Sequence, residues 1–403
     1  MRLLIAICLI LLGQTAAAGP EPYGPPVIFP AAQPAMDAAL AAFYADWTSV
    51  YLVEGCGPDR AYVSINADAG RLGGAATEGS LTISEAQGYG MLILVMMADF
   101  DPDAQRRFDA MLRFWQDHPA ASDPALMAWI QTPDCQTAGA DLGGAHTASD
   151  GDLDIAYALL LAETRWGNAG AFHYGNLARA TLAAILRAEV SVTDHILLGD
   201  WAAGSDHAGS TRTSDAMPAQ FMAFAAATGD GRWLAVRDRA YRILGAVQNR
   251  QTGLIPDFVV GLPGSPAPAG PDFLESDRDG WMNWNAVRVP WRVALDALIH
   301  DDPRARALLI PFNRFVRTVS GGDPARLVEG YPLDGRPPGD SGAAGMTFVA
   351  MFAVAAMLDT DHPEWLQSLW ARLLEVPVGS EDYYGNTLKL LAMISISGHW
   401  ASP

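Results

Sequence analysis

The feature that most constrains this chain is the repeated occurrence of apolar residues at helical spacing. Twelve segments show it, and loops containing Gly, Asp, Pro and Ser separate them. Nowhere do apolar and polar residues alternate over a stretch that would predict a large sheet. We therefore expect an all-α chain. The predicted helices span 35–53, 84–98, 103–117, 152–166, 171–190, 215–228, 231–249, 285–300, 303–319, 342–358, 362–375 and 384–397.

The length of 403 residues exceeds that of a usual single domain. No linker between the helices is richer in Gly and Pro than residues 261–271, which argues against two independent bundles. Twelve helices in one chain instead predict six helical hairpins that close into a toroid with one concave end. We expect residues 19–403 to form this single domain. The sixfold arrangement rests on the number of helices, because no internal sequence repeat supports it.

The N-terminus is typical of a signal peptide. Arg2 precedes a short apolar run at 3–12, and small residues at 15–18 offer a cleavage site. The run is too short to cross a bilayer, and no other stretch predicts a transmembrane span. We expect residues 1–18 to be removed and the protein to be secreted or periplasmic. An uncleaved anchor, or a form lipid-modified at Cys8, is the alternative.

The net charge bears on the binding partners, and the cysteines bear on a possible disulfide. With 45 acidic and 26 basic residues, the formal net charge is −19. A broad phosphate-binding surface is difficult to build from this composition, so nucleic acid is not an expected partner. Removal of the signal peptide leaves Cys56 and Cys135 in an oxidising compartment. A disulfide between them and two buried thiols are equally compatible with the sequence.

A first candidate site lies at residues 84–91, Ser-Glu-Ala-Gln-Gly-Tyr-Gly-Met. Ser84 is a candidate cap for a helix beginning with Glu85, and an acid in a first helical turn is often explained by the helix dipole alone. Gly88 and Gly90 weaken that explanation, because glycines in the first turns of a helix cost stability. They indicate that some group, a ligand among the candidates, approaches the backbone closely.

A second candidate site lies at residues 148–156, Ala-Ser-Asp-Gly-Asp-Leu-Asp-Ile-Ala, ahead of an apolar helix. Capping by Asp150 or Asp152 and solvent exposure of Asp154 would explain one or two of these acids. Three clustered carboxylates repel one another, however, and a functional site tolerates such repulsion. Calcium is disfavoured, because the glycine and distal glutamate of an EF-hand are absent at their expected spacing. We expect no metal.

A third candidate site, residues 275–292, is dense in acids, Trp and Arg. It begins within the longest irregular stretch, 261–280, and long loops in compact domains are often functional. Indole faces bordered by carboxylates and guanidinium groups suit a sugar, since flat apolar surfaces pack on pyranose rings and polar groups bind hydroxyls. No nucleophile elbow, paired histidine spacing or glycine-rich phosphate loop is present, which disfavours serine hydrolase chemistry.

Together these segments resemble family 8 of the glycoside hydrolases, whose bacterial members include cellulases, lichenases, chitosanases and xylanases. Residues 148–166 resemble the family's signature, and further similarity lies at 84–91, 212–221, 288–292 and 384–391. The resemblance covers almost the whole mature chain and implies an (α/α)6 barrel that hydrolyses with inversion of anomeric configuration. It also implies that Glu85 protonates the leaving oxygen. Asp150, or less favourably Asp152, would bind the sugar at the cleavage point.

One position departs from the common family pattern. Many members carry their catalytic base, an aspartate, three residues before the arginine that Arg288 matches, whereas this chain has Asn285 there. An amide does not accept a proton at neutral pH. A subgroup that includes chitosanases and lichenases resembles this chain, with Asn at this position and a glutamate base in the preceding loop. Glu275 is therefore the expected base, ahead of Asp277 and Asp279.

An inverting glycosidase needs a protonated carboxyl on one side of the scissile bond and a carboxylate holding water on the other, roughly 6.5–9.5 Å away. A helix N-terminus favours ionised Glu85, so burial or a carboxylate such as Asp150 must raise its pKa. His207, Asp382 and Tyr383 are left open between substrate contact and a structural role. The candidates for substrate binding are Tyr89, Asp152, Asp215, Trp284, Asn285, Arg288 and Tyr384.

These observations predict an exported, monomeric endo-β-1,4-glycanase that needs no cofactor. Its expected polysaccharide is a β-glucan, either cellulose or mixed-linkage glucan, or chitosan. The negative charge would attract cationic chitosan, but exported cellulose-acting enzymes are commonly acidic too, so charge does not decide. A catalytically silent carbohydrate-binding protein is the alternative if Asn285 has removed the base. A polysaccharide lyase is a third reading, and its usual Tyr, His and Arg grouping is not visible.

Overall fold

The computed structural model describes residues 23–24, 26–67, 79–336, 339 and 342–403. The predicted signal peptide, with Cys8, lies outside these residues. Twelve α-helices occur within them, at the positions that the periodicity predicts. They are α1 (Gln33–Tyr51), α2 (Ser84–Met96), α3 (Ala104–Asp117), α4 (Ser149–Trp166), α5 (Tyr174–Ala188), α6 (Pro218–Thr228), α7 (Arg232–Val247), α8 (Val289–His300), α9 (Pro303–Ser320), α10 (Met346–Ala356), α11 (Pro363–Glu375) and α12 (Tyr383–Ile396).

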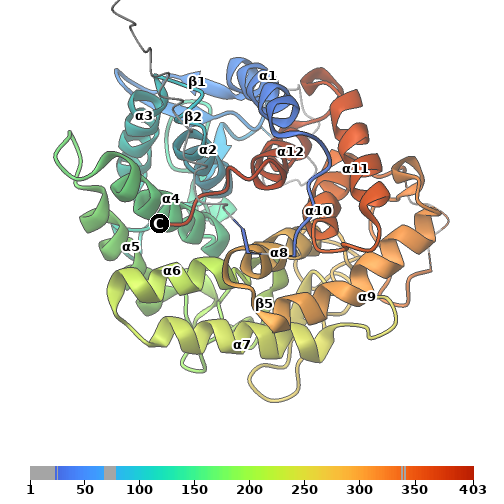
Figure 1. Cartoon of the computed structure of the whole chain (residues 1–403). Coiled ribbons are helices and arrows are strands. Elements are labelled where there is room, and N and C mark those ends of the chain that lie inside the picture. Colours follow the sequence, from blue (N-terminus) through green and yellow to red (C-terminus); the bar gives the residue numbers. More distant parts are fainter. Residues whose placement is uncertain (1–22, 25, 68–78, 337–338, 340–341) are drawn as a thin grey trace, which may run out of the picture.

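The helices form two rings, one inside the other (Figure 1). The even-numbered helices make the inner ring: α2 packs on α4, and contacts continue through α6, α8, α10 and α12 until α12 returns to α2. The odd-numbered helices lie outside them. Six helical hairpins therefore close into an (α/α)6 barrel, which confirms the predicted fold.

Three helices of the inner ring are almost completely buried. All of α10 is buried, and in α2 and α12 only Glu85 and Tyr384 are not. Helices surrounded by protein are apolar on every side, whereas an outer helix such as α3 buries one face and exposes polar residues on the other. The two exceptions, Glu85 and Tyr384, both lie in first helical turns. The inner ring is therefore open to solvent at the end where those turns lie.

The strands are short, and no large sheet occurs in the described part of the chain, as predicted. The antiparallel pairs are β1 (Leu52–Glu54) with β2 (Ala61–Val63), β3 (Thr82–Ile83) with β4 (Ile130–Gln131), and β6 (Phe258–Val260) with both β5 (Thr211–Arg212) and β7 (Ala267–Pro268). Strand β3 leads directly into α2, and β6 lies in the long connection between α7 and α8. The small sheets thus hold the loops beside the candidate sites.

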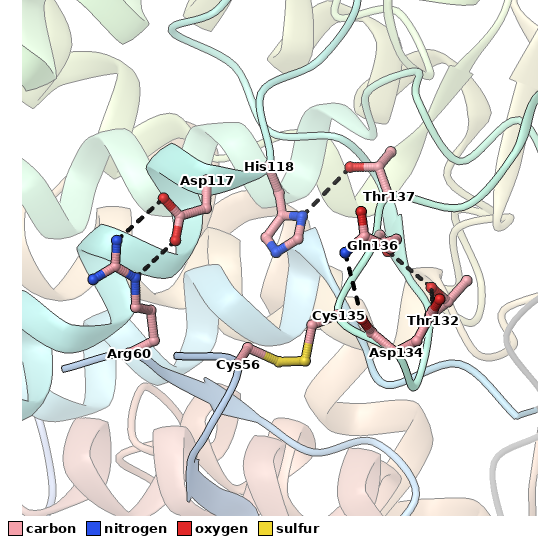
Figure 2. Close-up of a disulfide and its surroundings, with 9 residues drawn as sticks. All are labelled: Cys56, Arg60, Asp117, His118, Thr132, Asp134, Cys135, Gln136 and Thr137. Atoms are coloured by element: carbon pink, nitrogen blue, oxygen red, sulfur yellow. Dashed lines mark hydrogen bonds and ion pairs between the residues drawn. A yellow bond between two sulfur atoms is a disulfide. The ribbon is translucent and has the colours of Figure 1, made fainter. Parts of the chain in front are cut away.

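Cys56 and Cys135 form a disulfide, which decides between the two states that the sequence left open (Figure 2). Their Cα atoms lie 5.6 Å apart across a sequence separation of 79 residues. Cys56 follows β1 and Cys135 follows β4, so the bond links the β1–β2 hairpin to the β3–β4 pair. Because β3 leads into α2, the bridge braces the segment that carries Glu85.

The two glycines of α2 make room for the protein itself rather than for a ligand. A Cβ atom on Gly88 would lie 2.9 Å from Cβ of Asp154 on α4, and one on Gly90 would lie 2.5 Å from the Val63 side chain. On α4, Gly151 faces Ser84 in the same way, at 2.6 Å from its Oγ atom. Helices α2 and α4 therefore pack closely at their first turns, which brings two of the candidate sites together.

Candidate active site

The predicted site residues gather where the first turns of several inner helices meet. Glu85 is the second residue of α2, and Asp150 is the second residue of α4. Arg288 immediately precedes α8, and Tyr383 begins α12. Hydrogen bonds join all four side chains. Residues far apart in the sequence thus form one site at one end of the barrel.

Arg288 is the centre of this site. Its Nη1 atom donates hydrogen bonds to Glu85 Oε2 at 2.9 Å, to Asp150 Oδ2 at 2.8 Å and to the hydroxyl oxygen of Tyr89 at 2.9 Å. Its Nη2 atom donates to Asn285 Oδ1 at 2.9 Å. The residue is 2% exposed. This buried cation therefore holds two carboxyl groups and an amide in defined positions.

A second arginine repeats the pattern one helical turn away. Arg292 donates to both oxygens of Asp154, at 2.9 and 2.5 Å. Asp150 and Asp154 are four residues apart on α4, as are Arg288 and Arg292 at the start of α8, so each pair lies on one helical face. Asp154 is completely buried, and the alternative that it faces solvent is therefore wrong.

Asp152 lies outside this cluster. A step of two residues on a helix turns the side chain by about 200°, which directs Asp152 away from Asp150. Its Oδ1 atom accepts a hydrogen bond from Met127 N at 2.9 Å, and the residue is fully buried. Burial and the neighbouring Glu189 hold the pKa of Asp152 well above its usual range. The structure therefore gives no support to Asp152 as a substrate ligand.

The alternatives based on capping and calcium also fail on geometry. Helix α2 has Ile83 at its N-cap and α4 has Ala148, and neither helix has a side-chain cap. Ser84, Asp150 and Asp152 are therefore not capping residues. Asp150 and Asp154 bind separate arginines and Asp152 faces away from both, an arrangement unsuited to a shared calcium ion. Within the described residues, no group of three or more His, Cys, Asp or Glu side chains is arranged to hold a metal.

The surroundings of Glu85 favour its protonated form, which a general acid needs. Burial raises its pKa to about 7, an effect that Arg288 opposes and Asp150 reinforces. Its other oxygen, Oε1, lies 3.5 Å from the hydroxyl of Tyr383. Burial acts to raise the pKa of Asp150 as well, but Arg212 and Arg288 outweigh it and lower that pKa. The two carboxyl groups are therefore driven toward different protonation states.

Glu275 joins the same site from the loop between β7 and α8. Its Oε2 atom accepts from the amide of Asn285 at 2.7 Å, and its Oε1 atom accepts from Arg212 Nη2 at 3.2 Å. The side chain is 44% exposed. Because Asn285 also accepts from Arg288, a chain of hydrogen bonds runs from Glu275 through Asn285 and Arg288 to Glu85. The two carboxyl groups expected to act in catalysis lie at the same end of the barrel.

The other acids in the region are placed differently. Asp277 is exposed. Asp279 is 1% exposed, and its carboxylate accepts three backbone N–H groups of its own loop. Asp215 is completely buried with Oδ2 3.8 Å from Arg212 Nη1, and burial raises its pKa to about 7. Buried carboxyls of this kind position neighbours more readily than they contact a polymer.

Among the predicted substrate-binding residues, Trp284 is exposed and Tyr384 is half-buried beside it. Trp284 is 40% exposed, with its ring centroid 5.3 Å from that of Phe348 and 6.4 Å from that of Tyr384. The Tyr384 hydroxyl donates to the carbonyl oxygen of Trp284 at 2.9 Å, which ties α12 to the loop before α8. Tyr89, in contrast, is fully buried behind Arg288. An exposed, braced indole is the surface that a pyranose ring packs on.

Two of the residues left open have structural contacts. Asp382 caps α12 by accepting from Gly385 N at 2.8 Å. His207 packs edge-on between Trp201 and Phe273, with ring centroids 5.3 and 5.1 Å away. Tyr383, the third, contacts Glu85 as described above.

Sequence reasoning did not identify Asp257 or assign a role to Arg212. Asp257 accepts backbone N–H groups from Asn283 at 2.9 Å, Asn285 at 3.2 Å and Ala286 at 2.6 Å, and burial raises its pKa to about 7. It therefore holds the turn that carries Asn285. Nothing in the local pattern distinguishes this single acid. Arg212 lies in residues 212–221, which resemble the family. Its position three residues before Asp215 was the available indication that it belongs to the site.

Comparison with known proteins places these residues in a family. The family model for glycosyl hydrolases family 8 matches residues 59–398. The β-glucanase of Niallia circulans is 38% identical over 372 residues, which cover 91% of this chain and 86% of that protein. The endoglucanase of Bacillus sp. strain KSM-330 is 33% identical over 383 residues, with 92% and 78% covered.

Similarity to a solved structure agrees. The apo structure of a β-1,3-1,4-glucanase from Paenibacillus sp. X4 superposes with a TM-score of 0.87 at 36% identity, covering 94% of this chain and 97% of that one. Across the described residues, none of the helices combines the length and the apolar character needed to cross a bilayer. The match along most of the chain and the shared fold show that this protein belongs to family 8 of the glycosyl hydrolases and is a glycoside hydrolase.

Proposed function

We propose that this enzyme is a secreted, monomeric, inverting endo-glucanase that cleaves β-1,4 linkages in mixed-linkage β-glucan. Residues 19–403 would form its single catalytic domain after removal of the signal peptide at 1–18. Glu85 is the general acid, Glu275 is the general base, and Asp150 binds the sugar at the cleavage point. No cofactor takes part in this scheme.

The observation that carries the proposal is the hydrogen-bond chain from Glu275 through Asn285 and Arg288 to Glu85. An inverting pair must lie roughly 6.5–9.5 Å apart with a sugar ring and a water between the two carboxyl groups, and in this chain both groups lie at one end of the barrel with two side chains between them. Glu85, with its raised pKa, gives its proton to the glycosidic oxygen as the bond to the anomeric carbon breaks. Water attacks that carbon from the opposite face, and Glu275 accepts its proton. Proton exchange with solvent then restores the protonated form of Glu85 and the ionised form of Glu275.

Asn285 has a positive role in this scheme. It donates to Glu275 with its amide nitrogen and accepts from Arg288 with its amide oxygen, a combination that a carboxylate cannot provide. An aspartate at this position would place a second negative charge 2.7 Å from the proposed base. The Asn285 amide is therefore compatible with Glu275 as the base. This argues against the alternative of a catalytically silent carbohydrate-binding protein.

The choice of mixed-linkage β-glucan rests on the similar proteins. One of them is named a β-glucanase, and the solved structure is that of a β-1,3-1,4-glucanase. Cellulose and chitosan are the competing polymers. Trp284 offers an apolar face that all three would use, so it does not discriminate among them.

The test is the release of reducing ends from barley β-glucan, carboxymethylcellulose and chitosan, with proton NMR of the first products. We expect the highest kcat/KM on barley β-glucan, a rapid fall in viscosity and the α-anomer first. The Glu85→Gln variant should still bind β-glucan but cleave it about 10²- to 10⁴-fold more slowly. Highest activity on chitosan would replace the substrate assignment, and the β-anomer as first product would refute inversion.

A further inference from the structure

We propose that Asp279 is a positioning residue that fixes the proposed base, Glu275, by binding the backbone of the loop that carries it. This inference rests on the proposed function, because it assigns Asp279 a role through Glu275. The carboxylate of Asp279 accepts three consecutive backbone N–H groups, from Leu274 at 2.6 Å, Glu275 at 3.0 Å and Ser276 at 2.9 Å. The Ser276 hydroxyl adds a fourth contact at 3.3 Å.

The need for such an anchor follows from where Glu275 lies. It sits in an irregular segment between β7 and α8, and its side chain is 44% exposed. Helices hold Glu85 and Asp150, whereas no helix or strand holds Glu275. Displacement of a catalytic group by about 1 Å costs on the order of 100-fold in rate. Three charge-assisted hydrogen bonds to consecutive amides restrict this displacement.

Asp279 is itself attached to the rest of the site. Its carbonyl oxygen accepts from Phe258 N on β6 at 3.1 Å. Phe258 pairs in register with Arg212, the arginine that contacts Glu275. The preceding residue, Asp257, holds the backbone of Asn285, the other side chain that contacts Glu275. Arg212, Asn285 and Asp279, the groups that position Glu275, are therefore all paired with or hydrogen-bonded to the backbone or side chain of residues 257 and 258.

Asp279 is buried, unlike the neighbouring acid Asp277 in the same loop. It is 1% exposed, so a sugar polymer does not reach its carboxylate. Asp277, two residues earlier, is exposed. Replacing each by Asn removes the same charge from the same loop, but only Asp279→Asn disturbs the three amide contacts. An Asn side chain has one acceptor oxygen, and its NH2 group faces an N–H donor.

The experiment compares kcat and KM on β-glucan for Asp279→Asn and the control Asp277→Asn. We expect kcat to fall 30- to 100-fold in Asp279→Asn, with KM within twofold of wild type and a thermal midpoint within a few degrees. Asp277→Asn should keep the wild-type kcat. Wild-type kcat in Asp279→Asn, or an equal loss in both variants, would overturn the inference.

A double-mutant cycle with Glu275→Ala separates this inference from the proposed function. If Asp279 acts through Glu275, Asp279→Asn should cause no further loss of the residual activity of Glu275→Ala. A further 30-fold loss in that background would show that Asp279 acts by another route and overturn the inference alone. Wild-type activity of Glu275→Ala would overturn the base assignment and this inference with it.

If Asp279→Asn does not fold, the Leu274→Pro variant tests the same role, because it removes one of the three N–H donors to Asp279. We expect a five- to tenfold loss of kcat at constant KM. No loss would refute the positioning role of Asp279.

Discussion

Replacing Glu85 by Gln should reveal a general acid whose contribution depends on pH and on the leaving group. With a pKa raised by burial to about 7, Glu85 is mostly protonated at pH 6 and mostly ionised at pH 8. The kcat/KM of the wild-type enzyme on β-glucan should therefore decline through pH 7 and fall about tenfold per unit above it.

General acid catalysis contributes about 10²- to 10⁴-fold for a poor leaving group such as a sugar hydroxyl. The Glu85→Gln variant should lose activity by this factor on β-glucan at pH 6. In a 2,4-dinitrophenyl cello-oligosaccharide the leaving group departs as 2,4-dinitrophenolate and needs no proton, so cleavage of this substrate by the variant should fall less than about tenfold. With that substrate the decline above pH 7 should disappear.

The assay measures reducing ends for β-glucan and absorbance for dinitrophenolate between pH 5 and 9. Binding of a cello-oligosaccharide, measured by calorimetry, serves as the control for an intact cleft. Equal losses on both substrates would mean that Glu85 does not deliver the proton to the leaving oxygen. A Glu85→Gln variant within tenfold of wild type on β-glucan would refute the assignment.

Three further predictions concern stability and binding. Cys135→Ser should lower the free energy of unfolding by up to about 4.5 kcal/mol, from the chain entropy of a 79-residue separation; an unchanged denaturant midpoint would contradict this. Burial raises the pKa of Glu189 to about 8, so its protonated form stabilises the folded state fully below pH 4.5, and this contribution is lost as pH rises through 8. The thermal midpoint should fall less steeply between pH 5 and 9 in Glu189→Gln than in wild type, and equal slopes would reject the explanation. Trp284→Ala should raise KM on β-glucan about two- to tenfold with a smaller change in kcat, and an unaltered KM would show that this indole does not contact substrate.

The fold was predictable because its determinants are local. Each helix carries its own apolar periodicity, and loops rich in Gly, Pro, Asp and Ser separate the helices. The twelve predicted helices in one chain then favoured a closed toroid of six helical hairpins. Motif resemblance and the substitution at Asn285 pointed to Glu85 and Glu275, and the structure brings these two side chains to the same end of the barrel.

What was not predictable depends on contacts between distant segments. Asp152 was grouped with Asp150 because the two are close in sequence, but helical rotation places them on opposite sides of α4. Gly88 indicated a close approach, yet only packing shows that α4 and not a ligand makes it. Asp257 had no local signal, since its partners are backbone amides about thirty residues further along the chain.

The central claim, that Glu85 and Glu275 act on opposite faces of one sugar ring, is tested most directly by a crystal structure of Glu85→Gln with a bound β-glucan oligosaccharide. A water should lie about 3 to 3.5 Å from the anomeric carbon, on the face opposite residue 85, with a hydrogen bond of about 2.6 to 3.2 Å to Glu275. A water held in that position by Asp277 or Asp279, or a Glu275 side chain on the same face as residue 85, would contradict the account.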